Sequence, residues 1–343
     1  MVDEIRIKLT IRMQAFKRNI QDKNIVCKQS VVRISCARRL QMGTFIDKVK
    51  RNIAAGRYAS AGFDPRDAMI PDCLRGDRAD VTLADWRNFM TRLIPPSVPH
   101  AGQFKLNWAF FLSRGSRGLA LLEDLCGVIK QAAPHAVLTI DMKVGDISDS
   151  NHGYVNFAFD ICGADAITVH PYMGREAMKP FLEDPDKGVF VLCRTSNPSG
   201  EEFQGTFKDK DPLFMQVARN VAEFWNTNHN CGLVIGATRP DELTRIRTIA
   251  PVIPLLIPGI GKQGGSLRDS VTAAVSQERG ALFFLHQSSS FMHASVGEEF
   301  AQAAGTALEI ANIDVRHLLS RLGRRSIEIP PSEPPPDEIS RDW

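Results

Sequence analysis

The chain has 343 residues, and its 42 Lys and Arg residues against 39 Asp and Glu residues leave a net charge of only +3. This balance offers no general electrostatic basis for binding nucleic acid or a membrane surface, so any anion site has to be local. The seven cysteines form no C-x-x-C pair, and no apolar stretch approaches the roughly 20 residues of a membrane-spanning helix, so we expect a protein of the reducing cytoplasm without a disulfide framework or structural zinc.

The two ends of the chain differ in composition from the middle. Residues 1–41 carry ten basic and three acidic residues without Gly or Pro, which predicts a basic N-terminal extension that is solvated or partly helical. An organelle-targeting sequence and a natural start at Met42 are the alternatives. Residues 324–343 contain five prolines and are predicted to form a disordered or polyproline tail. A single domain is expected between these ends, over 42–323.

Short apolar runs alternate with longer amphipathic segments throughout this domain. The continuous apolar character of the runs favours parallel strands that are covered by helices on their outer face. Eight strand–helix units indicate an α/β fold, a (β/α)8 TIM barrel, whose chemistry is carried by the carboxyl ends of the strands. The expected strands are 58–63, 103–107, 136–141, 165–169, 188–193, 232–236, 253–257 and 281–285.

Charged side chains gather where the third expected strand ends. Asp141 and Lys143 are two residues apart, so in an extended segment both side chains point to the same face, and Asp146 follows in a loop. A local salt bridge would explain the pair. A lysine between carboxylates also stays protonated, however, and can donate a proton, while the aspartate would repel a substrate carboxylate. Asp64 after the first strand and Lys105 late in the second are expected at the same rim.

A glycine-rich segment, IPGIGKQGGSLRDS, follows the seventh expected strand over 257–270. Its glycines permit close backbone approach to a phosphate, and phosphate sites after strands seven and eight recur in this barrel. An ordinary glycine-rich turn is the alternative. The part from Lys262 to Ser270 is the candidate lid over the site.

Several motifs in order carry a family resemblance across about 42–312. They are GFDPR, FKLNWAFF, DMKVGDISDS, DAITVHPYMG, VLCRTSNPSG, GLVIGAT and LIPGIGKQGG. With D-x-K-x-x-D at Asp141, Lys143 and Asp146, the chain resembles the longer, bacterial-type branch of the orotidine 5′-monophosphate decarboxylases. The resemblance implies a carboxy-lyase of pyrimidine biosynthesis that converts orotidine 5′-monophosphate to uridine 5′-monophosphate (UMP).

The resemblance also implies roles for the charged residues. Lys143 would protonate C6 of the pyrimidine as carbon dioxide leaves, and Asp141 would lie against the substrate carboxylate. Lys105 would complete the row of alternating charges, and Asp64 would bind ribose hydroxyls.

Other implied roles concern a partner subunit and the rest of the nucleotide. Asp146 is implied to reach into the partner's site together with Ile147 and Ser150, so a homodimer with shared active sites is expected. Ser196 would bind the pyrimidine. The remaining implied substrate-binding residues are Asn107, Pro258, Gln263, Gly264, Gly265, Ser288 and Ser289.

The implied reaction needs no metal or organic cofactor. His152 and His170 are possible metal ligands but are better interpreted as hydrogen-bonding residues of a helix and the rim. Ser289 departs from the family pattern because it stands where an arginine usually binds the phosphate. A serine supplies no charge there, so Arg268 or Lys262 would have to.

Two other functions compete with this prediction. A sugar-phosphate lyase or aldolase of the same superfamily also uses D-x-K-x-x-D, but it normally needs a divalent metal and gives no role to the TSNP and GKQGG segments. A degenerate barrel that binds a nucleotide without turnover is favoured by Ser289 and opposed by the intact lysines and aspartates.

Overall fold

The computed structural model describes residues 44–205, 211–261, 264–275 and 280–323. The expected extension over 1–41 and the proline-rich tail over 324–343 lie outside these ranges, and so does Gln263. None of the helices within the described ranges is both long and apolar enough to cross a membrane.

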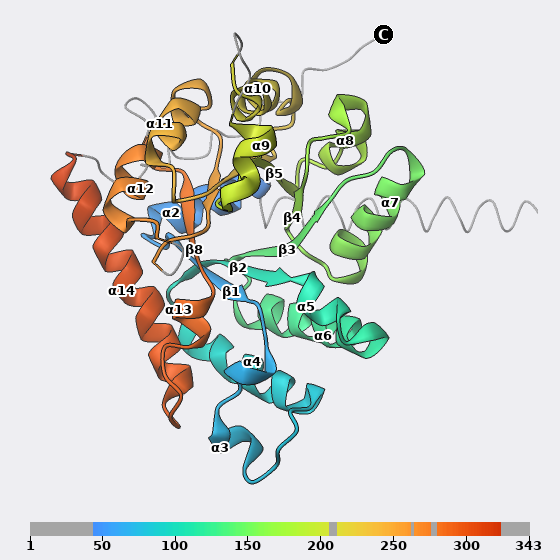
Figure 1. The fold of residues 1–343 in the computed structure, drawn as a ribbon, viewed down its shortest axis with the longest axis vertical. Helices are drawn as coiled ribbons and strands as arrows, with labels where there is room; N and C mark the ends of the chain where they lie inside the picture. Colours follow the sequence, from blue (N-terminus) through green and yellow to red (C-terminus); the bar gives the residue numbers. More distant parts are fainter. Residues whose placement is uncertain (1–43, 206–210, 262–263, 276–279, 324–343) are drawn as a thin grey trace, which may run out of the picture. The chain divides into compact units, whose positions relative to one another are not determined.

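Eight parallel strands close into a barrel in which each strand pairs with the next and β8 pairs with β1 (Figure 1). The (β/α)8 fold predicted from the sequence is thereby confirmed. The strands are β1 Ala59–Phe63, β2 Ala101–Asn107, β3 Val137–Val144, β4 Ala166–Val169, β5 Gly188–Arg194, β6 Cys231–Ile235, β7 Leu255–Ile257 and β8 Phe283–Gln287.

Helices surround the barrel and connect successive strands. The α-helices are α2 Phe45–Ala54, α3 Asp72–Arg75, α4 Leu83–Ser97, α5 Trp108–Leu112, α6 Gly115–Ala132, α7 Asp149–Val155, α8 Gly174–Leu182, α9 Glu201–Gln204, α10 Leu213–Arg219, α11 Pro240–Ile249, α12 Leu267–Ala274, α13 Ser289–Met292 and α14 Phe300–Arg321. Short 3-10 helices η1 and η3 cover Asp67–Met69 and Pro198–Gly200, and π-helical segments η2 and η4 continue α7 and α10 over Asn156–Ile161 and Asn220–Trp225.

Helix α2 covers the amino-terminal end of the barrel. The Phe45 ring packs edge-on against Phe190 of β5 with 5.7 Å between centroids. The Lys48 Nζ lies 2.7 Å from Oδ2 of Asp165, which precedes β4, and both side chains are largely buried. This end of the barrel is closed by packing, so the carboxyl ends of the strands are the open end.

The C-terminal helix α14 is attached to the first strand through Asn312. The Asn312 side-chain oxygen accepts hydrogen bonds from the backbone N–H groups of Tyr58 and Ala59 at 2.8 and 2.9 Å, and its Nδ2 donates to the His100 carbonyl. All of these groups are inside or at the edge of the core, where an unsatisfied backbone N–H would be costly. Asn312 therefore completes the hydrogen bonding at the start of β1.

Strand β3 runs three residues beyond its predicted end at 141. The pairing with β4 shifts register between Ile140 and Val144, and within this interval Lys143 has φ of 51°. The left-handed conformation is unfavourable for a residue with a Cβ and is typical of functional sites. The strand therefore ends in an irregular segment at the position where the sequence places its charges.

Candidate active site

The charged cluster lies at the carboxyl ends of β2, β3 and β4. Asp141 is buried and contacts two lysines: Lys105 binds Oδ2, and Lys143 Nζ lies 2.6 Å from Oδ1. The Thr168 hydroxyl donates to the same Oδ1 at 2.7 Å and accepts the Lys143 backbone N–H at 3.0 Å. Asp141 thus has three donor contacts, one each from β2, β3 and β4, which fix both its position and its negative charge.

The two partners of Asp141 differ in exposure. The Lys105 side chain is 5% exposed and the Lys143 side chain 45% exposed, so only Lys143 extends into open space. Burial by itself would raise the pKa of Asp141, but Lys105 and Lys143 outweigh it and hold that pKa far below its ordinary value. Burial would likewise lower the pKa of Lys105, but the carboxylates of Asp141 and Asp64 outweigh it and raise that pKa. Asp141 and Lys105 are therefore both ionised near neutral pH.

Asp64 and His286 border this cluster on the side of β1 and β8. The Oδ1 atom of Asp64 is buried and finds no hydrogen-bond partner among the described residues, as expected of a group that awaits a ligand. His286 faces Ser60 across the β1–β8 pair, with 3.2 Å between its Nδ1 and the hydroxyl. Burial and the nearby Lys105 ammonium hold the pKa of His286 well below its ordinary value, so its ring is neutral. A Cβ atom at Gly62 would overlap this ring, which explains the glycine.

A cavity of about 780 Å³ opens beside Asp64 and His286. The loops after β7, β8 and β1 form its wall, which is the usual place for a phosphate in this fold. Four of the predicted substrate-binding residues, Asp64, Pro258, Ser288 and Ser289, line it. The cavity therefore extends from Asp64 and His286, at the border of the charged cluster, to the region where the sequence predicts the phosphate.

The glycine-rich loop after β7 folds back on itself. Its Gly261 N–H donates to Gly265 O at 3.0 Å, Gly264 N–H to Gly261 O at 2.7 Å, and Gly265 N–H to Gly259 O at 3.1 Å. Gly261 and Gly264 have φ of 76° and 88°, a conformation that suits only glycine. The glycines were predicted to permit close backbone approach to a phosphate, but in this conformation these three N–H groups donate within the loop itself.

Of the residues predicted to reach a partner subunit, Asp146 and Ile147 lie on the loop after β3 and Ser150 lies in the first turn of α7. Asn151 holds this loop, since its side chain accepts the Asp146 N–H at 2.9 Å and donates to the carbonyl of Asp146 at 2.6 Å. Asp146 is half-buried, Ile147 is 57% exposed, and Ser150 is exposed. The loop thus presents an apolar side chain and polar groups on the surface instead of directing them into the barrel of its own chain.

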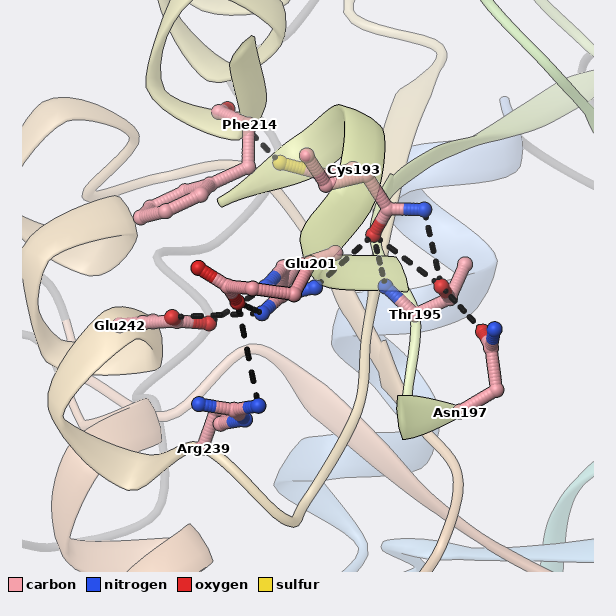
Figure 2. A network of polar contacts seen from close by, with 9 residues as sticks. Cys193, Thr195, Asn197, Glu201, Phe214, Arg239 and Glu242 are labelled. Atoms are coloured by element: carbon pink, nitrogen blue, oxygen red, sulfur yellow. Dashed lines mark hydrogen bonds and ion pairs between the residues drawn. The ribbon is translucent and has the colours of Figure 1, made fainter. Parts of the chain in front are cut away.

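Ser196 lies on the loop after β5, and a buried polar network holds that loop (Figure 2). The Arg194 guanidinium is 1% exposed and pairs with Glu201 at 2.5 Å and with Glu242 of α11 at 2.6 Å. Gln204 accepts the Thr195 N–H at 2.8 Å and an Arg194 N–H at 3.3 Å. Thr195, which precedes Ser196, is therefore held in place by Gln204 at the far end of the loop.

The other candidate residues have ordinary structural contacts. Asn107 accepts the Ala109 N–H and caps α5. His170 Nε2 donates to the Gly145 carbonyl at 3.1 Å, and its Nδ1 accepts the Tyr172 N–H. Exposed His152 lies on α7. Within the described residues, no three His, Cys, Asp or Glu side chains come together as a possible metal site.

A larger cavity of about 860 Å³ lies between the ends of β4 and β5 and helices α8 and α10. Its lining is mainly apolar and includes none of the ionised cluster around Asp141. The smaller cavity does not include Asp141 or its two lysines either, but Asp64 and His286, which border the cluster, line it. The chemistry is therefore expected at the smaller cavity.

Two participants in the site were missed from the sequence. Thr168 is a polar residue inside the apolar run DAITV, and His286 is a lone histidine inside ALFFLHQ. A polar residue in an otherwise apolar barrel strand was the available signal for both.

Comparisons with known proteins agree with this geometry. A family model described as orotidine 5′-phosphate decarboxylase / HUMPS family matches residues 94–285. The orotidine 5′-phosphate decarboxylase of Janthinobacterium sp. is 41% identical over 262 residues, which cover 76% of this chain and 94% of that protein.

Solved structures with 32% sequence identity give the same assignment. The Leishmania donovani OMP decarboxylase aligns with a TM-score of 0.67 over 80% of this chain and 99% of that one. Leishmania donovani UMP synthase aligns with a TM-score of 0.69 over 80% of this chain and 56% of that larger one. The chain belongs to the orotidine 5′-phosphate decarboxylase / HUMPS family.

Proposed function

We propose that the protein decarboxylates orotidine 5′-monophosphate to UMP in pyrimidine synthesis without a cofactor. The observation that carries the proposal is the Lys105–Asp141–Lys143 row at the carboxyl ends of β2 and β3. Asp141 is held ionised by two lysines at a site where a substrate carboxylate would be repelled. The half-exposed Lys143 is a protonated donor for the carbon from which carbon dioxide departs.

The rest of the nucleotide would extend from this row into the cavity. Asp64, with its unsatisfied oxygen, would bind the ribose hydroxyls, and Ser196 the pyrimidine. The phosphate would lie between the loops after β7 and β8, with Pro258, Gln263, Gly264, Gly265, Ser288 and Ser289 around it. Binding energy from the phosphate would favour the carbanion-like transition state over the ground state, because the charged row is already in place.

We further infer a cytoplasmic homodimer in which Asp146, Ile147 and Ser150 complete the partner's site. The exposed loop after β3 supports this inference, since a 57% exposed Ile147 beside charged groups is suited to an interface. Residues 42–323 would form the enzyme domain, with 1–41 and 324–343 as an extension and a tail.

The test is a decarboxylation assay that follows the loss of orotidylate absorbance, with and without a chelator. We expect turnover that persists in the chelator and disappears in Lys143→Ala. Lysine-dependent turnover of a sugar phosphate in place of orotidylate would instead establish the rival lyase. Tight UMP binding without any turnover would establish the degenerate barrel.

A further inference from the structure

Three loops meet around the phosphate end of the 780 Å³ cavity. They follow β7, β8 and β1, and the last of them brings Arg66 to the same cavity wall as Ser288, Ser289 and Ser290. The serines offer hydroxyl donors but no charge. A nucleotide phosphate is dianionic near neutral pH, so a site for it is expected to contain a cation.

Arg66 is the only lysine or arginine among the described residues that line this cavity. The other ionisable groups there do not supply positive charge: His286 is neutral because burial holds its pKa well below the ordinary value, and Asp64 and Asp314 are acidic. The N–H groups of Gly261 and its neighbours donate within their own loop. Among the described residues that line the cavity, the electrostatic complement to a phosphate therefore comes from one side chain, and Lys262 lies outside the described residues.

The backbone of the loop after β1 is fixed beside the serines. The N–H of Asp64 contacts the sulfur of Met292 in α13 at 3.3 Å, and α13 begins at Ser289. On the other side, the Arg66 carbonyl accepts the Met69 N–H at 2.9 Å, which closes η1. These two contacts hold Arg66 at the mouth of the cavity while its long side chain stays adjustable.

The guanidinium of Arg66 is available for a ligand. The residue is exposed, and no described Asp or Glu lies within ion-pair distance of it. Its guanidinium carbon lies 5.6 Å from the centroid of the Phe110 ring, a weak contact at an exposed site. Because a guanidinium binds phosphate through two parallel N–H groups, a phosphate in the cavity would compete well with this ring.

We propose that Arg66 binds the phosphate of the nucleotide and supplies the positive charge of the phosphate site. This inference rests on the proposed function and adds to it a residue that distinguishes nucleotides from nucleosides. Arg66 would contribute binding energy at the end of the substrate remote from the reacting carbon.

The test compares the affinities of UMP and uridine by titration calorimetry for wild type, Arg66→Ala and Arg66→Gln. Both variants are expected to bind UMP about 10- to 100-fold more weakly than wild type, because they lose a charge-assisted contact with the phosphate. Their affinity for uridine, which has no phosphate, should stay within about twofold of wild type. The glutamine variant keeps much of the side chain's length, so agreement between the two variants identifies the charge as the cause.

Arg92→Ala is the matched control. Arg92 is also exposed and lies over an aromatic ring, 4.8 Å from the Phe300 centroid, but it is not part of the cavity wall. It should leave both affinities unchanged. Unchanged UMP binding in the Arg66 variants, or an equal loss for UMP and uridine, would overturn the proposal. If wild type turns over orotidylate, either of these results rejects only the phosphate-binding role of Arg66. If wild type neither turns over orotidylate nor binds UMP, the proposed function is rejected as well.

Discussion

The Nζ atom of Lys143 lies 2.6 Å from Oδ1 of Asp141, while Lys105 occupies the other oxygen of the same carboxylate. A buried carboxylate between two ammonium groups carries a desolvation cost that stability alone rarely returns. The arrangement is better explained by chemistry, because it holds the one exposed ammonium in place beside the carboxylate.

Replacing Lys143 by Ala should lower kcat by at least about 10³-fold, since the proton donor at the reacting carbon is lost. The expected effect on folding is small, because the Lys143 side chain is 45% exposed and Lys105 still neutralises Asp141. Stopped assays on orotidylate, with circular dichroism as the folding check, would measure both. Retention of a tenth of the activity would show that another group donates the proton.

Mixing two inactive variants should restore activity if the sites are shared. When Lys143→Ala and Asp146→Ala protomers are co-expressed at equal levels, half of the dimers are heterodimers. Each heterodimer has one intact site and one inactive site. About a quarter of wild-type activity is therefore expected from the mixture. The two variants mixed without subunit exchange serve as the control. No recovery in verified heterodimers would mean that each site is complete within one chain.

Gln204→Ala should lower kcat/KM about tenfold, because it removes the acceptor of the Thr195 N–H next to Ser196. The effect should fall mainly on KM, since the charged row is unchanged. Steady-state kinetics would separate the two constants. Gln216→Ala, an exposed glutamine on α10, is the control. If kcat instead falls in proportion to the fraction of folded protein, the substitution has destabilised the whole protein.

His286 should make stability depend on pH between about 6.5 and 5. Its folded-state pKa is below the ordinary value, so the unfolded chain binds the extra proton first. The contribution is complete above about pH 6.5 and is lost as pH falls toward the folded pKa, at up to about 1.4 kcal/mol per pH unit.

Urea unfolding at pH 7.5 and 5.0 would test this dependence. The wild type should lose roughly 1 to 2 kcal/mol more than His286→Gln between these two pH values. His317→Gln, which changes an exposed histidine on α14, is the control. Identical pH responses of wild type and His286→Gln would show that His286 takes up its proton at the same pH in the folded and unfolded states, so that burial does not lower its pKa.

The barrel could be predicted from the sequence because its strands are buried on both faces and therefore read as continuous apolar runs. The D-x-K-x-x-D spacing also located the charged cluster correctly in relation to the third strand. The Asp141 and Lys143 side chains point toward one another as expected, but the backbone there is not regularly extended. Lys143 takes φ of 51°, and the Thr168 hydroxyl holds its N–H.

Long-range contacts explain what the sequence left undetermined. Thr168 and His286 contribute through neighbours on adjacent strands, and a single chain gives no direct information on which strand positions meet. The loop after β1 was predicted to supply Asp64. The place of Arg66, two residues later, in the cavity wall depends on the pairing of β1 with β8, which the sequence does not show. The role of Gln263 remains a prediction, since it falls outside the described residues.

The attachment of α14 to β1 has a consequence for synthesis of the protein. The acceptor for the N–H groups of Tyr58 and Ala59 is Asn312, which is translated 254 and 253 residues later. A nascent chain on the ribosome therefore carries an incomplete first strand and an open barrel until almost the whole domain has emerged. Such a chain exposes apolar strand edges for much of its translation and is expected to depend on chaperones during that time.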